Sequence, residues 1–278
     1  MLPEIIHFDQ SAFVKGRTIF DAIRTIDDVI EHTMNRDISG ILVAIDFEKA
    51  FDSLNFSFVI RVLHAFNFGP SFIQWVRVLY NKVSSGGPFS LSRGVRQGDP
   101  LSPYLFILAL EILAIKIRND NNIQGIRIGE KIVKLTLFVD DMTCFIRDIR
   151  SYSNLFETLR AFGAISGLKV NKDKTEALAL GNSGSLWEGH LVINNLCDII
   201  KILGVYFGGD AKKREELNFW KTLESIRKTI NLWKWRGLSL IGRIQIVKTF
   251  AIPKLMFRAS AISISKDLVK AQRSYFRS

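Results

Sequence analysis

Amphipathic and fully apolar stretches alternate along this chain. Apolar side chains recur at helical spacing within residues 16–33 and predict a helix that packs through one face. Residues 40–47 are almost uniformly apolar, which is typical of a strand covered on both faces. Helical spacing returns in residues 55–67 and 72–82, and the intervening Gly69-Pro70 is a stop signal. The first part of the chain is therefore predicted as helix, strand, helix and helix.

A buried helix is predicted in the middle of the chain. Ser102 and Pro103 form a favourable N-terminus, with serine as the N-cap and proline at the first helical position. The helix is expected to extend to about Arg118. Its apolar stretch, residues 104–115, is too short to span a bilayer and contains Glu111. These features favour a core helix over a membrane segment.

Shorter elements follow this helix. Residues 152–166 are predicted as a helix closed by Gly167, and residues 132–137 and 143–146 as two apolar, β-branched strands of a hairpin. Further strands are predicted near 175–180 and 202–207. Strands and helices mixed in this order predict an α+β fold, with an antiparallel or mixed sheet and helices on one face.

The C-terminal tail, from Glu215 onward, has a mostly helical pattern. Gly237 is expected to break it and Pro253 to end it, and Gly242 is a further candidate break. An apolar stripe of Trp220, Ile226, Ile230 and Trp233 predicts helix packing rather than base stacking by the tryptophans.

The positive charge is concentrated in this tail. The chain carries a net charge of +11, yet residues 211–278 contain 16 Lys or Arg against 4 Asp or Glu, which leaves 22 against 23 in residues 1–210. Such a tail is typical of contact with a polyanion, and an ordinary solvated helical face is the alternative. With 47% hydrophobic and 23% charged residues, the composition is that of a globular protein rather than a disordered one.

Two cysteines, Cys144 and Cys197, are too few and too far apart for a disulfide framework or a zinc site. The N-terminus lacks the basic flank of a secretory signal. The expectation is an intracellular protein of the nucleus, the cytoplasm or both, not secreted and without a membrane partner.

Candidate chemistry lies at the ends of the apolar strands. Asp46 ends the strand of residues 40–47, and Asp140-Asp141 lies at the tip of the predicted hairpin. Adjacent carboxylates repel one another and are costly beside apolar neighbours, and a divalent cation relieves both penalties. Three such aspartates suit a cage for two hard cations, as in nucleotidyl transfer. Taken alone, Asp46 is more typical of a capping or loop aspartate. Asp140-Asp141 could form a hairpin turn, although Asp-Asp without glycine is not a favoured two-residue turn.

A glycine-containing loop lies between these two sites. Residues 93–103 combine Gly94, Gln97 and Gly98 with the capped N-terminus of the middle helix. Glycines allow close approach to a backbone, and a helix N-terminus favours phosphate. A tight loop with no ligand would have a similar composition.

Six motifs in order carry a family resemblance. The motifs are Gln10-Ser-Ala-Phe-Val-Lys-Gly-Arg17, Asp46-Phe-Glu-Lys-Ala-Phe-Asp52, Arg96-Gln-Gly-Asp-Pro-Leu-Ser-Pro103, Phe138-Val-Asp-Asp141, Ser166-Gly-Leu-Lys-Val-Asn171 with Lys174, and Leu203-Gly-Val205. With these motifs in this order, the chain resembles the reverse transcriptase domain of non-LTR retrotransposons, the long interspersed element type, over residues 10–257. Val139 stands where the family more often has alanine.

The resemblance implies a right-hand polymerase palm with partial fingers and a helical thumb. It assigns Asp46 and Asp140 to two Mg²⁺ ions, for which Mn²⁺ is a substitute, with Asp141 in support and the Phe47 carbonyl as a further ligand. The implied reaction is addition of dNTPs to the 3′-hydroxyl of a DNA primer on an RNA template.

Further roles also follow only from the resemblance. Phe51 is placed as an aromatic gate against the ribose 2′-hydroxyl, while Gln97 and Gly98 line the nucleotide pocket. Lys174 is a candidate general acid or pyrophosphate contact. The primer grip is assigned to Leu203, Gly204 and Val205, and nucleic-acid contacts in the thumb to Lys221, Arg227, Lys228 and Lys234. A core phenylalanine, a loop amide and solvated lysines are the alternatives.

The implied domain boundaries are partial fingers over 1–38, a palm with inserted finger elements over 39–209, and a truncated basic thumb over 210–278. In the family, an arginine-containing segment of the fingers lies upstream of the motif that begins here at Gln10. The sequence starts too late to include that segment, so a fragment of a longer reading frame is expected. Two alternatives remain: an inactive remnant that retains RNA or RNA–DNA binding, and a group II intron-type maturase.

Overall fold

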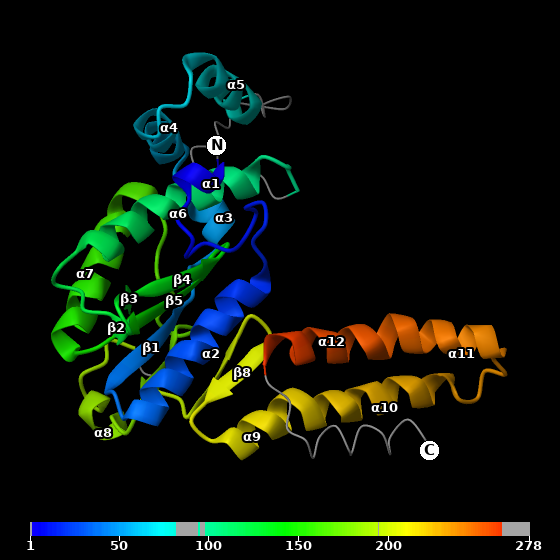
Figure 1. Ribbon diagram of the computed structural model, residues 1–278. Coiled ribbons are helices and arrows are strands. Elements are labelled where there is room, and N and C mark those ends of the chain that lie inside the picture. The colour runs from blue at the N-terminus through cyan, green and yellow to red at the C-terminus, as the bar shows by residue number, and fades with distance from the viewer. Residues whose placement is uncertain (1, 82–93, 95–97, 194, 263–278) are drawn as a thin grey trace. The chain divides into compact units, whose positions relative to one another are not determined.

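The computed structural model describes residues 2–81, 94, 98–193 and 195–262. The chain divides into two compact units, residues 1–197 and 198–278. The first unit contains the sheet and the helices that cover it, and the second contains a hairpin followed by helices (Figure 1).

A four-stranded antiparallel sheet forms the centre of the first unit. Its strands are β1 (Gly40–Ile45), β4 (Leu135–Phe138), β5 (Asp141–Ile146) and β6 (Glu176–Leu180), in the order β4-β5-β1-β6. The apolar strand and the hairpin predicted from the sequence therefore pair with each other. Ile45 lies opposite Met142, and Phe138 lies opposite Asp141.

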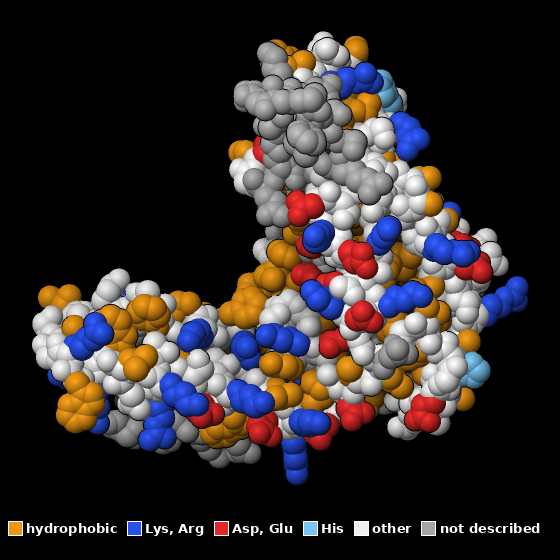
Figure 2. Space-filling model, turned by 180° about the vertical axis from the view of Figure 1, so that it is seen from behind, with side chains coloured by type: hydrophobic (Ala, Val, Ile, Leu, Met, Phe, Trp, Pro, Cys, Tyr) orange, Lys and Arg blue, Asp and Glu red, His pale blue; other side chains and the backbone are white. Residues whose placement is uncertain are grey.

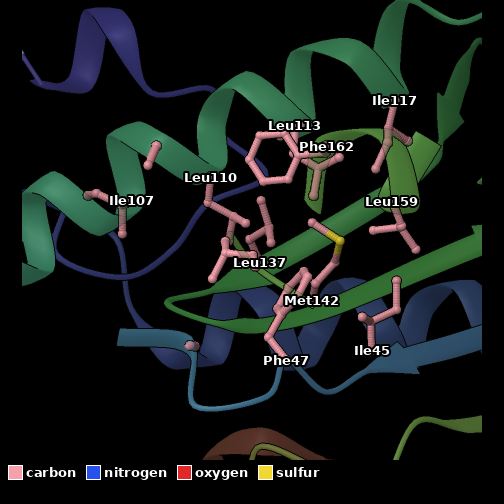
Figure 3. Packing of buried hydrophobic residues seen from close by; sticks show 14 of the residues in the cluster. Ile45, Phe47, Ile107, Leu110, Leu113, Ile117, Leu137, Met142, Leu159 and Phe162 are labelled. Atoms are coloured by element: carbon pink, nitrogen blue, oxygen red, sulfur yellow. The ribbon is translucent and has the colours of Figure 1, made fainter. Parts of the chain in front are cut away.

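Helices cover both faces of this sheet, which corrects the expectation of helices on one face. Buried side chains of α6 (Ser102–Asn119) and α7 (Ile149–Ser166) join Ile41, Val43 and Ile45 in one apolar cluster. Figure 3 shows members of this cluster, including Leu110 and Phe162, pointing toward the strands. The alternate residue Leu42 is also fully buried, and α2 (Ile19–Arg36) contacts both sheet edges, β4 and β6, on that second face.

The remaining elements of the first unit are short or peripheral. They are α1 (Leu2–Ile5), α3 (Ala50–Ser53), α4 (Phe56–Ala65), α5 (Pro70–Asn81), the hairpin β2 (Ile126–Ile128) with β3 (Lys131–Val133), and α8 (Gly184–Trp187). Helix α7 ends as predicted, because Gly167 adopts φ +86° at its C-terminus.

The predicted start of the middle helix is off by one residue. Leu101 is the N-cap of α6, and Ser102 is already helical. The Ser102 hydroxyl instead lies 2.7 Å from the hydroxyl of Tyr80 on α5, and an Asp99 carboxylate oxygen accepts from the Leu101 N–H at 2.9 Å. Asp99 therefore supports this helix start in place of the serine.

The second unit begins with a hairpin rather than the single strand predicted over 202–207. Strands β7 (Ile199–Ile202) and β8 (Val205–Gly208) are joined by Leu203 and Gly204. Both residues have positive φ, +50° and +80°, which is the signature of a type I′ turn. The apolar residues continue through Leu203, so the sequence pattern predicted one strand and gave no sign of the turn between β7 and β8.

Helices make up the rest of the second unit: α9 (Ala211–Glu215), the π-helical turn η1 (Glu216–Trp220), α10 (Lys221–Trp233), α11 (Leu240–Ile246), the π-helical turn η2 (Val247–Ala251) and α12 (Ile252–Ala261). Gly237, at φ +54°, lies between α10 and α11 as predicted. Gly242 lies inside α11 and does not break it, and Pro253 occupies the first turn of α12 rather than the end of the helical tail, so both of these predictions were wrong.

None of the helices in the described residues combines the length and apolar character needed to cross a membrane.

Candidate active site

Three aspartates lie at the same end of the two central strands. Asp46 directly follows β1, Asp141 is the first residue of β5, and Asp140 is in the turn before it. Because Ile45 is paired with Met142 in antiparallel register, the next step of the ladder brings Asp46 beside Asp141. Side chains alternate along a strand, so both lie on the face opposite to Ile45 and Met142.

The turn that carries the pair is strained. Phe138 pairs with Asp141, which leaves Val139 and Asp140 as a two-residue loop. Val139 has φ +60°. A left-handed first residue is typical of a type II′ turn, where glycine is preferred, and a β-branched residue is rarely found there. Such conformations cost on the order of 1–3 kcal/mol and cluster at functional sites.

Burial and mutual repulsion act together on the carboxyl groups. Burial raises the pKa of Asp141 from its ordinary value of 3.8 to about 6, with further increases from the charges of Asp140 and Asp46. The pKa of Asp140 is also raised, mainly by burial and then by Asp46, although its own backbone N–H opposes the shift. A cation placed among these oxygens would reverse both effects.

The three aspartates offer carboxylate oxygens, the type of ligand that hard divalent cations take. Within the described part of the chain, no Lys or Arg forms an ion pair with any of the three aspartates. In the same residues, no group of three or more His, Cys, Asp or Glu side chains is arranged closely enough to enclose a metal ion. Mg²⁺ commonly takes one or two carboxylates and completes its shell with water and substrate phosphate, so an open set of carboxylates suits it.

A distant segment fixes the backbone of Asp46. The Asn171 N–H donates to the Asp46 carbonyl at 2.8 Å, and the Asp46 N–H donates to the Thr175 hydroxyl at 3.2 Å. The Glu48 N–H donates to the Lys169 carbonyl at 2.8 Å. The structure thus brings the motif that contains Lys174 alongside the first aspartate, while the Lys174 side chain itself is exposed.

Phe51 lies on α3, five residues after Asp46, and is half-buried. Its ring stacks on Phe106 of α6, with centroids 4.5 Å apart and an interplanar angle of 21°. Gly94 packs against this region, because a Cβ atom there would lie 3.2 Å from the Asp52 carbonyl oxygen. Gly98 is exposed with φ +88°, and the predicted pocket residue Gln97 lies outside the described residues.

The predicted primer-grip and thumb residues belong to the second unit. Leu203 and Gly204 form the β7–β8 turn, and Val205 is buried at the start of β8. Asn218 of η1 fixes this hairpin, because its side-chain amide accepts from the Tyr206 N–H at 2.9 Å and donates to the Tyr206 carbonyl at 2.8 Å.

Basic side chains line the helices of the second unit (Figure 2). All four predicted contacts are exposed: Lys221, Arg227, Lys228 and Lys234. Lys228 pairs with Glu224 at 2.8 Å on the same helix. Trp233 stacks on Phe250 and lies under the Arg236 guanidinium, which agrees with a packing role for that tryptophan.

Three residues that contact the aspartate motifs were given no role from the sequence. Asn171 and Thr175 hold Asp46, and the Gln10 side chain bonds to the backbone of Val139. Gln10 and Asn171 belong to the six motifs, so their motif membership was the one sequence signal that could have pointed to a role for them.

Comparison with known proteins places these features in context. The family described as "Reverse transcriptase (RNA-dependent DNA polymerase)" matches residues 1–207. The Transposon TX1 uncharacterized 149 kDa protein of Xenopus laevis is 29% identical over 298 aligned positions, covering 98% of this chain and 22% of that protein. The Pol polyprotein of the type-2 retrotransposable element R2DM of Drosophila melanogaster is 26% identical, covering 85% of this chain and 21% of that protein.

Solved structures that are similar to this chain include two telomerases in complex with a fragment of telomeric RNA. The Candida albicans enzyme has a TM-score of 0.47 at 12% identity, covering 93% of this chain and 46% of that one. The Candida tropicalis enzyme has a TM-score of 0.49 at 13% identity, covering 90% of this chain and 42% of that one. The chain spans about a fifth of the length of the two transposon proteins that it matches.

Proposed function

Because this chain belongs to the reverse transcriptase (RNA-dependent DNA polymerase) family, we propose that it is the polymerase core of a non-LTR retrotransposon protein. The reaction is the addition of dNTPs to the 3′-hydroxyl of a DNA primer on an RNA template. The observation that carries the proposal is the set of three aspartates, brought together from β1 and the β4–β5 hairpin, two of which have raised pKa values.

The family uses divalent metal ions, and Mg²⁺ is the proposed cofactor here. Asp46 and Asp140 would hold it, with Asp141 in support and the Phe47 carbonyl as a further ligand. When bound, such ions activate the primer hydroxyl and neutralise charge on the triphosphate. The protein contributes rigid placement: the ladder sets Asp46 against Asp141, and the hydrogen bonds from Asn171 and Thr175 fix the Asp46 backbone.

The incoming nucleotide is proposed to lie against Phe51, Gln97 and Gly98. The stack on Phe106 holds the Phe51 ring in one orientation, which a steric gate requires. Lys174 is proposed to reach the pyrophosphate. The hydrogen bonds between its segment and Asp46 to Glu48 support this placement.

The second unit is proposed as primer grip and thumb. The tight turn at Leu203 and Gly204, followed by Val205, would support the primer end. The exposed Lys221, Arg227, Lys228 and Lys234 would contact the phosphates of the RNA–DNA duplex, since phosphate contacts supply most of the sequence-independent affinity.

Single aspartate variants test this proposal. Asp46→Asn and Asp140→Asn should each reduce primer extension at least about 10³-fold, because each removes a charged carboxylate ligand of the proposed divalent cations. Binding of a primer–template duplex should change less than about twofold, since the phosphate contacts lie elsewhere. Extension that persisted in a pure sample of either variant would refute the assignment.

A further inference from the structure

Gln10 lies buried beside the catalytic hairpin. The residue is 1% exposed. The N-terminal segment pairs with the end of β4: the Ser11 N–H donates to the Leu137 carbonyl at 2.9 Å, and the Leu137 N–H donates to the Asp9 carbonyl at 2.8 Å. This pairing brings Gln10 to the point where β4 enters the strained turn.

The Gln10 amide binds both backbone polar groups of Val139. The Val139 N–H donates to Gln10 Oε1 at 3.2 Å, and Gln10 Nε2 donates to the Val139 carbonyl at 3.3 Å. Oε1 also accepts from the Ala12 N–H at 2.9 Å, which fixes the orientation of the amide. A side-chain amide offers a donor and an acceptor side by side, so it can satisfy both groups of one residue.

Val139 is the place where the hairpin needs such support. A β-branched residue at φ +60° persists only when its surroundings hold it there. The next two residues are Asp140 and Asp141, so any relaxation of Val139 would change the directions of both carboxylates.

The N-terminal segment has an anchor of its own. The Arg17 guanidinium donates to the carbonyls of Ile6, His7 and Gln10, at 2.9, 2.5 and 2.8 Å. The backbone of the segment is therefore held without the Gln10 side chain, whose longest-range contacts go to the turn.

We propose that Gln10 is a positioning residue for the polymerase site: its amide clamps Val139 in the left-handed turn conformation and so fixes the Asp140-Asp141 pair. The clamp itself follows from the contacts above, and its catalytic consequence rests on the proposed polymerase function.

The first test replaces the amide in the full chain. Gln10→Met keeps the length and volume of the side chain and removes both hydrogen bonds to Val139. The Val139 amide should then exchange with solvent about tenfold faster, the effect of losing one to two hydrogen bonds of ordinary strength. In primer extension, kcat should fall about tenfold, while KM for dNTP and duplex affinity stay within about twofold.

A matched control separates the clamp from general loss of stability. Thr136→Val removes the hydrogen bond of the Thr136 hydroxyl to the Asp9 carbonyl, a contact of 3.3 Å between the same two segments that does not involve the turn. This variant should leave the exchange of Val139 and kcat within about twofold of the parent.

Val139→Gly provides a rescue, because glycine adopts positive φ without strain. Adding it to Gln10→Met should restore kcat at least threefold relative to Gln10→Met alone. Unchanged exchange and kcat in Gln10→Met, or equal effects in Thr136→Val, would overturn the proposal. If the parent chain shows no polymerisation, the exchange comparison alone decides on the clamp, and only the proposed function fails.

Discussion

At the scale of single residues, the site concentrates unfavourable features that only a ligand or a special neighbour offsets. Two carboxyl groups have raised pKa values, and a valine occupies a turn position that favours glycine. In a protein of ordinary stability such features are costly, and they are expected mainly where function requires them.

Asp141 should lower stability in the metal-free protein. Its pKa in the folded state, about 6, exceeds the ordinary 3.8, so the folded chain holds the proton more tightly than the unfolded chain. The free energy of unfolding therefore falls as pH rises from about 4 to 6. Asp141→Asn should remove this fall and raise stability at pH 7 by about 1 kcal/mol. This value is discounted for solvent screening, because Asp141 as a whole residue is exposed although its carboxyl group is surrounded by enough protein to raise its pKa.

Thermal unfolding in EDTA at pH 4 and at pH 7 checks this expectation. Mg²⁺ should then raise the melting temperature of the parent more than that of the Asn variant, because binding to the folded state stabilises it. A variant no more stable than the parent at pH 7 would contradict the electrostatic description of the site.

Phe51→Ala should relax the choice of sugar. Removal of the ring opens space where a 2′-hydroxyl would lie, so the ratio of ribonucleotide to deoxyribonucleotide incorporation should rise at least about tenfold. Competition assays with matched NTP and dNTP pairs measure it. Phe56→Ala is the control, because Phe56 is also half-buried and stacked, on Tyr80. An unchanged ratio in Phe51→Ala would assign that ring to packing alone.

The aspartates were predictable because their signal is local. An apolar strand ending in Asp46 and an Asp-Asp pair between two apolar runs are visible within ten residues of sequence. The Gln10 clamp was not predictable in this way, because it joins residues 129 positions apart and depends on a positive φ at Val139 that its residue type disfavours. The cap of α6 was assigned to Ser102 because serine favours that position, but the structure uses its hydroxyl to contact Tyr80.

At the scale of elements, the central relation is between β1 and the segment 168–175. This segment has little regular structure, yet it contributes three hydrogen bonds to residues 46–48. Its position makes it a support for the first aspartate as well as the carrier of Lys174.

Thr175→Val should test this support. The substitution keeps the side-chain shape, removes the hydroxyl that accepts from the Asp46 N–H, and should cost about 1 kcal/mol of stability. Because Asp46 is then less well placed, kcat should fall about tenfold with little change in KM. Thr33→Val, which removes the hydrogen bond of a buried hydroxyl to Val29 in α2, should cost similar stability without this loss of kcat. Equal losses of kcat would make the effect one of general stability.

Element prediction succeeded where the periodicity was long and failed where it was short. The helix predicted over 152–166 and the strand predicted over 40–47 had clear patterns and flanking signals, and the structure has α7 and β1 there. The β7–β8 hairpin was missed because Leu203, an apolar residue, occupies a turn position at φ +50°. The start of α12 was missed because Pro253 suits the first turn of a helix as well as the end of one.

At the scale of the whole molecule, charge is divided between the two parts of the chain. Residues 211–278, which carry the basic excess, lie entirely within the second unit, while residues 1–210 are near neutral. This division was predictable from composition alone, whereas the arrangement of side chains along α10 required the structure.

Substitution of four basic residues should change the salt dependence of binding. With Lys221, Arg227, Lys228 and Lys234 all changed to Gln, the slope of log K against log salt for an RNA–DNA duplex should become shallower by about 3. The control replaces four exposed basic residues of α4, α6 and α7, namely Arg61, Lys116, Arg150 and Arg160. Equal slopes for the parent and this four-residue variant would remove these residues of the second unit from the binding surface.

Primer extension on poly(rA)/oligo(dT) with Mg²⁺ and dTTP is the most direct test of the central claim. The parent chain should extend the primer, and the double variant Asp140→Asn/Asp141→Asn should bind the duplex without extending it. If neither protein extends a duplex that both bind, this chain is not a working polymerase, and its role is reduced to nucleic-acid binding.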